Sequence, residues 1–147
     1  MLTLALLLSF ATTAQALYYP ASWYNYYAPG GWTYNAPVNP SYNCLAYALG
    51  FTSVWIWPDW AGTYVSEAEM DIEMVNWGKL RTTNAVEAQI VAYGYAGDIR
   101  HAAKVTTPTT RTIAKWGRIE RFSHPWSPYR ISPTEPLAYG GIRRYYW

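Results

Sequence analysis

The second half of the chain constrains the fold most strongly, because its hydrophobic pattern is that of an antiparallel sheet. Short runs rich in Ile, Val, Tyr and Thr alternate with turn formers such as Gly97-Asp98 and Pro108. Two such runs joined by a short turn predict a hairpin. The predicted strands are residues 88–95, 100–106, 111–117 and 141–147.

Two helices are predicted ahead of these strands. Ser41 and Asn43 are suited to cap a helix over residues 44–49, which Gly50 ends. Ser66 is suited to cap a second helix over residues 67–80, whose Met70, Met74 and Trp77 recur at helical spacing and predict a core-facing side. Helices followed by an antiparallel meander predict an α+β domain, with the first helix packed on a small sheet.

Cys44 is the single cysteine of the chain and falls in the first turn of the predicted helix. There the unpaired backbone N–H groups and the helix dipole favour a thiolate, which is the nucleophilic form, and the same N–H groups can stabilise an oxyanion. A lone cysteine also serves as a small buried apolar residue. A nearby base decides between the two interpretations.

The first sixteen residues have the pattern of a secretory signal. An apolar run leads to Ala14-Gln15-Ala16, a small-residue cleavage pattern, although no Lys or Arg precedes the run. The run is short for a membrane span, so no transmembrane helix is expected after cleavage. The chain is therefore expected to be secreted, either extracellular or associated with the cell wall. In an oxidising compartment a single cysteine has no internal disulfide partner.

Residues 17–39 are dominated by Tyr, Trp, Asn, Pro and Gly, and the turn formers argue against a regular helix. The favoured interpretation is an extended segment that buries its rings against the domain; the alternative is an exposed surface that stacks on sugar rings or wall polymer. We therefore expect a signal segment over 1–16, an aromatic segment over 17–39 and one domain over 40–147.

Composition limits the classes of partner and cofactor that this chain is expected to bind. The 147 residues suffice for one domain with a core, and the net charge of only +2 does not suggest a nucleic-acid partner. One Cys and two separated His lack the close ligand spacing of a zinc site, so neither a metal nor another cofactor is expected. We expect a monomer.

The chain has two histidines, and both are candidates for the general base. His101 opens the predicted strand 100–106, at a strand end where it can face the helix of Cys44. His124 lies in a Pro-rich segment predicted to be a loop, and is the less constrained candidate. The aromatic cluster of Trp55 and Trp57 directly follows the Cys44 helix and is placed to form a wall of the site.

These residues together resemble a known group. The ordered series 42–50, 55–58, 90–94, 100–104 and 114–117, with Glu120 and His124, is similar to uncharacterised, often secreted bacterial domains related to the papain-like NlpC-type cysteine peptidases and amidases. The resemblance covers roughly residues 41–126. It implies a papain-like fold, Cys44 as nucleophile and His101 as base.

The sequence differs from the NlpC-type family pattern in two places. NlpC-type enzymes commonly carry His, Asn or Gln at a third position on the next strand; here that strand offers Lys115, with His124 and Asp98 as alternatives. Lysine orients an imidazolium poorly because both are cationic. Asn43 and Leu45 replace the Asp and Ser that flank the cysteine of cell-wall endopeptidases. The expected substrate-binding residues are Asn43, Tyr47, Trp55, Trp57 and His124.

The expected function is that of a secreted cysteine hydrolase, a peptidase or amidase that cleaves an amide bond, with a peptide or cell-wall peptide as substrate. The alternative is a non-catalytic, aromatic-rich surface or wall-binding module on the same fold. An acyltransferase or a toxin using the same Cys–His pair is a third possibility, because it would share the acyl-enzyme with a hydrolase.

Overall fold

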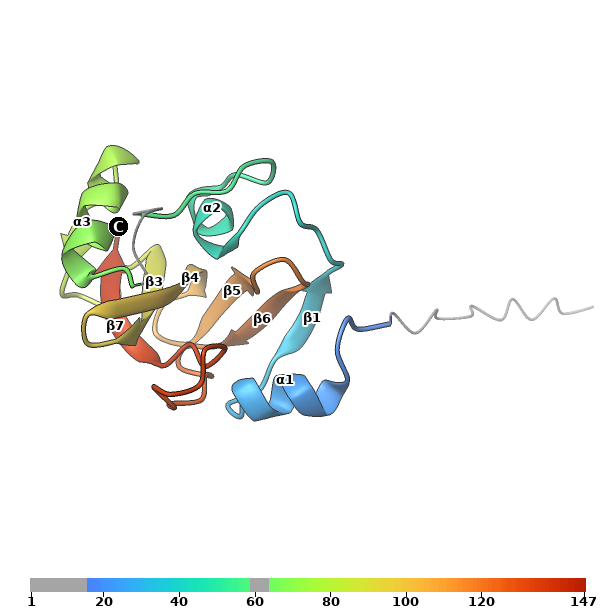
Figure 1. Ribbon diagram of the computed structural model, residues 1–147. Coiled ribbons are helices and arrows are strands. Elements are labelled where there is room, and N and C mark those ends of the chain that lie inside the picture. The colour runs from blue at the N-terminus through green and yellow to red at the C-terminus, as the bar shows by residue number, and fades with distance from the viewer. Residues whose placement is uncertain (1–15, 59–63) are drawn as a thin grey trace, which may run out of the picture.

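The computed structural model describes residues 16–58 and 64–147, and these residues fold around an open antiparallel sheet (Figure 1). The described residues form seven strands in the order β1-β6-β5-β4-β3-β7-β2. With three helices on its faces, the sheet makes this an α+β domain, as predicted. The strands are β1 (Thr33–Ala36), β2 (Arg81–Thr82), β3 (Ile90–Tyr95), β4 (Asp98–Thr107), β5 (Arg111–Lys115), β6 (Arg121–Pro125) and β7 (Gly141–Tyr146).

The centre of the sheet is the predicted meander. Strands β3 and β4 form a hairpin in which Tyr93 is opposite His101, and β4 pairs in turn with β5. Gly97 adopts φ 74° in the tight hairpin turn, a backbone conformation that glycine reaches without strain. The C-terminal strand β7 pairs with the free side of β3. All four predicted strands are confirmed, to within a few residues at their ends.

Helix α2 (Cys44–Leu49) is the predicted cysteine helix, and it lies over β4 and β5 (Figure 1). The Asn43 side chain accepts from the Ala46 N–H at 3.0 Å, which satisfies one of the donors left free at a helix start. Gly50 ends the helix in the left-handed conformation at φ 99°. Both predicted end signals are therefore confirmed, and Cys44 is the first helical residue.

Helix α3 (Glu67–Asn76) is the second predicted helix and begins with the capping box of Ser66 and Glu69. Met70 and Met74 are fully buried, as predicted. The prediction that Trp77 faces the core is wrong, because the helix ends at Asn76 and Trp77 is 40% exposed. Its ring packs instead against Phe51, with ring centroids 5.0 Å apart.

The aromatic segment does form regular structure, and the prediction against a helix there is wrong. It folds into helix α1 (Ala21–Tyr27) and strand β1, which pairs with β6 at the sheet edge. Seven residues rarely hold a helix through propensity alone, so tertiary packing stabilises α1. Tyr24 is fully buried against Phe122 and Trp116. The packing interpretation holds for Tyr24, whereas rings such as Tyr18 stay exposed.

Both histidine placements differ from the prediction. His101 is the fourth residue of β4, fully buried within the strand and not at its end. His124 lies on β6 and not in a loop, because Arg121–Pro125 pairs with β5 on one side and with β1 on the other. Pro125 is tolerated because it is the last residue of that strand.

The two faces of the sheet bury separate cores. One core lies under α2 and α3 and includes Leu45 and Met74; the other lies under α1 and includes Tyr24 and Trp116. In Figure 1, α2 and α1 accordingly lie on opposite sides of the sheet. Apart from Ala16, the predicted signal segment lies outside the described residues, and none of the helices within those residues has the length and apolarity to cross a membrane.

Candidate functional site

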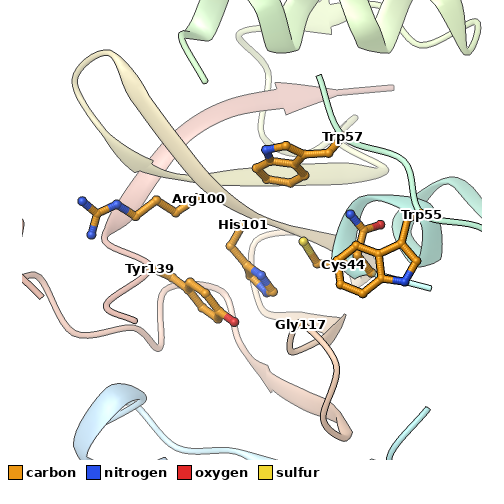
Figure 2. A pocket seen from close by; sticks show the side chains of 8 residues that line it. Cys44, Trp55, Trp57, Arg100, His101, Gly117 and Tyr139 are labelled. Atoms are coloured by element: carbon orange, nitrogen blue, oxygen red, sulfur yellow. The ribbon is translucent and has the colours of Figure 1, made fainter. Parts of the chain in front are cut away.

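A pocket of about 250 Å³ opens beside the N-terminal end of α2 (Figure 2). Five parts of the chain meet there: the start of α2, the loop that follows it, strand β4, the turn between β5 and β6, and the segment just before β7. The pocket is therefore assembled from residues nearly a hundred positions apart. Its lining residues are Asn43, Cys44, Trp55, Trp57, Arg100, His101, Gly117 and Tyr139.

Cys44 is buried, and burial decides its charge. Loss of solvation raises the pKa of its thiol to about 11, against the opposing effect of the backbone N–H groups of Ala102, Leu45 and Cys44 itself. The thiol is therefore protonated at neutral pH. The expected thiolate is absent from the resting site, because the six-residue helix does not offset the cost of burying the charge.

His101 has no exposed surface, and both of its ring nitrogens lack a hydrogen-bond partner among the residues that the structure describes. Burial, with a smaller contribution from His124, holds the pKa of its imidazole well below the usual value. The ring is therefore neutral and keeps one free lone pair and one free N–H. An unpaired buried polar group costs about 1–3 kcal/mol, so two on one ring call for an explanation.

The His101 ring is held by stacking and not by a hydrogen bond. Tyr139 lies parallel to it, with ring centroids 4.0 Å apart and an interplanar angle of 2°, and Tyr129 meets it edge-on at 5.2 Å. In Figure 2 the sulfur of Cys44 lies on one side of the His101 side chain and the Tyr139 ring on the other. A neutral thiol and a neutral imidazole thus face one pocket, without a hydrogen bond between them.

Asn43 lines the pocket, and hydrogen bonds hold its side chain in place. Its oxygen accepts from the N–H groups of Ala46 and Ile56, and its NH₂ donates to the Ile56 carbonyl at 2.8 Å. These bonds join the helix start to the loop that carries Trp55 and Trp57. Asn43 therefore positions two walls of the pocket, and its expected role in substrate binding stays a prediction.

Lys115 lies on β5 but does not reach His101. Its ammonium donates to the Gly117 carbonyl at 2.9 Å and to the Ile119 carbonyl, which closes the turn after β5. Burial lowers the pKa of Lys115 to about 8, against the effect of the nearby Cys44 and Glu120. Lys115 thus supports the turn whose Gly117 lines the pocket, and the third position expected on this strand forms no hydrogen bond with the imidazole.

The other candidates lie outside the pocket. The His124 ring contacts the hydroxyls of Thr112 and Tyr129 at 2.9 and 2.7 Å, and burial lowers its pKa to about 4. Tyr47 packs under the Arg121 guanidinium at 4.7 Å, and Asp98 pairs with Arg100 at 2.6 Å. None of the three lines the pocket of Cys44.

Arg100 and Tyr139 are site residues that the sequence interpretation missed. The Arg100 guanidinium donates to the carbonyls of Glu135, Ala138 and Pro133, and so clamps the loop that delivers Tyr139 onto His101. The sequence does not distinguish Arg100 from Lys104, an exposed cation on the same strand. Nothing in the sequence around Tyr139 distinguishes it from the other fourteen tyrosines.

No group of three His, Cys, Asp or Glu side chains within residues 16–58 and 64–147 is arranged to hold a metal ion. No curated protein and no solved structure was found to match this chain. Residues 33–147 match a family described as a domain of unknown function, DUF7689, and these residues include all of the sheet and the whole pocket of Cys44. The chain therefore belongs to the DUF7689 domain family.

Proposed function

We propose that this chain is a thiol hydrolase that cleaves an amide bond through an acyl-enzyme on Cys44, with His101 as general base. One observation carries the proposal: a buried imidazole, whose two nitrogens have no partner among the described residues, lines the same pocket as the only cysteine. A structural histidine of a core has its nitrogens paired, as His124 does. The unpaired lone pair of His101 is what a proton acceptor needs.

The proposed reaction has two halves. A ring nitrogen of His101 takes the Cys44 proton as the sulfur attacks the substrate carbonyl carbon; the C–N bond then breaks and the imidazolium returns that proton to the leaving amine. His101 next takes a proton from water, whose oxygen attacks the thioester carbonyl. The C–S bond breaks, the proton returns to the sulfur, and a carboxylic acid leaves.

The charges of the resting site favour proton transfer during attack over a preformed ion pair. Burial raises the pKa of Cys44 and lowers that of His101, so both groups wait neutral. The N–H groups of Cys44 and Leu45, in the first turn of α2, are the proposed donors to the oxyanion. They would then stabilise charge that appears only in the transition state.

The papain-like NlpC-type relationship belongs to the same proposal. Its support is the order of elements: a cysteine in the first turn of a helix that packs on the strand carrying the histidine. Tyr139 occupies the orienting place by stacking, where the family pattern uses a polar third residue. We further propose export through residues 1–16 and a peptide, such as a cell-wall peptide, as substrate.

A non-catalytic wall-binding module remains the second candidate, and one observation favours it. Tyr19 and Trp23 form a stacked pair, with ring centroids 4.5 Å apart, and Tyr19 is 38% exposed. Such a pair presents a flat apolar surface suited to ring-shaped ligands. This module would need no acyl-enzyme, so the chemistry of Cys44 distinguishes the two functions.

The test is acylation by p-nitrophenyl acetate, followed by nitrophenolate release and intact mass. We expect a burst with an acetyl adduct on Cys44 and slow turnover, no adduct in Cys44→Ala, and loss of both steps in His101→Gln. His124→Gln is the matched control, since it removes a buried imidazole that does not line the pocket. An adduct that forms equally in His101→Gln, with native circular dichroism in all variants, overturns the proposed role of His101.

Failure of folded wild-type protein to form any adduct overturns the hydrolase and leaves the binding module. Where the adduct forms, adding an amine such as glycinamide separates hydrolase from acyltransferase. Acetate as the main product supports hydrolysis, whereas acetylglycinamide as the main product shows transfer. Both products form from the same acyl-enzyme, so this experiment tests only whether water or an amine takes the acyl group in the second half of the reaction.

A further inference from the structure

A second pocket of about 470 Å³ adjoins the Cys44 pocket. Gly117 and Tyr139 line both, so the two pockets share a wall. The second pocket lies between the aromatic N-terminal segment and the turn after β5. Its lining residues are Tyr18, Tyr19, Trp23, Val38, Pro40, Trp116, Gly117, Arg118, Ile119, Leu137 and Tyr139.

The wall of the second pocket is aromatic and apolar with one cation. Tyr19 and Trp23 stack on each other at an interplanar angle of 24°, and Tyr18 meets Tyr19 edge-on at 4.8 Å. Among the described residues, the lining includes no Asp, Glu, Asn or Gln. Besides Arg118, the polar side-chain groups of this lining are the hydroxyls and ring N–H groups of its Tyr and Trp residues, so the wall is matched to an apolar or aromatic group with few hydrogen-bonding atoms.

Arg118 is the charged group of this wall, and it marks the boundary between the pockets. Its guanidinium lies 5.3 Å from the centre of the Trp55 ring, and Trp55 lines the Cys44 pocket. The residue is exposed, and within the described part of the chain no carboxylate pairs with it. Arg100, the other arginine at these pockets, is already bound to Asp98 and backbone carbonyls.

We propose that the second pocket is a binding subsite for an apolar or aromatic group that carries a carboxylate, with Arg118 binding the carboxylate. In the substrate this group lies away from the bond that Cys44 cleaves, as in a peptide with an apolar side chain beside a free carboxylate. The link to Cys44 rests on the proposed function. The proposed binding does not depend on that function, because every contact is made by residues of the second pocket, Arg118 included.

The test measures binding to the Cys44→Ala chain, which removes the thiol chemistry. The probes are 4-phenylbutyrate and its neutral amide, 4-phenylbutyramide, titrated while the indole N–H signals of Trp23 and Trp116 are followed by NMR. We expect both probes to shift these signals and the carboxylate to bind about fivefold more tightly than the amide, as for a partly exposed ion pair.

Arg118→Gln is expected to remove the difference between the probes, and Trp23→Ala to weaken both. Arg111→Gln is the matched control, an exposed arginine on β5 outside both pockets. Equal affinities in the starting chain, or an unchanged difference in Arg118→Gln, overturn the proposal. Because acylation of Cys44 is measured separately, loss of acylation with probe binding intact refutes the hydrolase and leaves the subsite standing.

Discussion

Mild acid should destabilise this fold through its buried histidines, and His124 allows the effect to be calculated. Burial lowers its pKa from 6.5 to about 4, with a smaller contribution from Arg111, so the native state excludes the proton that the unfolded chain takes up. Stability is therefore complete above the unfolded pKa and is lost as the pH falls toward the native one. Integrating the linkage from about pH 7 to about pH 5 gives a loss of about 2 kcal/mol from His124 alone.

Other groups do not cancel this loss. His101 is fully buried and its pKa is also lowered, so it adds to the loss in the same direction. The carboxyl groups of Glu67, Glu69 and Glu135 have pKa values below their usual 4.5, so they titrate mainly below about pH 5. Lys115, with a pKa of about 8, keeps its charge between about pH 7 and about pH 5. The interval between about pH 7 and about pH 5 thus isolates the histidines.

The assay is urea unfolding followed by tryptophan fluorescence at several pH values across this interval. Wild type should lose at least about 2 kcal/mol of unfolding free energy, and His124→Gln should lose about 2 kcal/mol less than wild type over the same interval. Ser123→Ala is a suitable control on the same strand. A wild-type unfolding free energy that stays flat, or a His124→Gln slope equal to that of wild type, would refute the burial argument.

Two further predictions concern the pocket. With a thiol pKa of about 11, Cys44 should react with iodoacetamide slowly at neutral pH in the folded chain and quickly after unfolding in urea; equal rates in both states would show that burial does not control the thiol. Arg100→Met should free the loop that carries Tyr139 and lower the free energy of unfolding by about 1–3 kcal/mol, because backbone carbonyls are left unpaired. It should also remove the upfield ring-current shift that Tyr139 causes in the NMR signals of the His101 ring protons. Arg111→Met should change neither the stability nor this shift.

The meander could be predicted from sequence because its information is local. The apolar runs of β3 and β4 and the glycine in the hairpin turn lie within twenty residues, as do the cap and terminator of α2. Strand β6 was missed although it pairs with its neighbour β5, because its five residues include Ser123 and Pro125, which indicate a loop, and its other partner, β1, lies nearly ninety positions earlier in the chain. Helix α1 depends likewise on burying Tyr24 against a distant strand.

The same distinction applies to the site. Cys44 and His101 were both proposed as site residues from sequence, because each belongs to an element with its own signal, and both line one pocket. The charge states of these two residues could not be predicted from sequence, since the pKa of each depends on burial by residues from several elements. The role of Lys115 depends on the turn that follows it, which directs the carbonyls of Gly117 and Ile119 at the ammonium.

The way in which His101 is held bears directly on the chemistry proposed for it. A polar third residue would accept a hydrogen bond from one ring nitrogen and thereby fix the tautomer. Stacking on Tyr139 fixes the plane of the ring but leaves both nitrogens without a partner in the part of the chain that the structure describes, so either tautomer can present its lone pair to the pocket. A base held in this way gains no stabilisation of its imidazolium from a carboxylate. Proton transfer in step with bond formation at the sulfur, followed by prompt return of the proton, is therefore the reaction course that this arrangement favours.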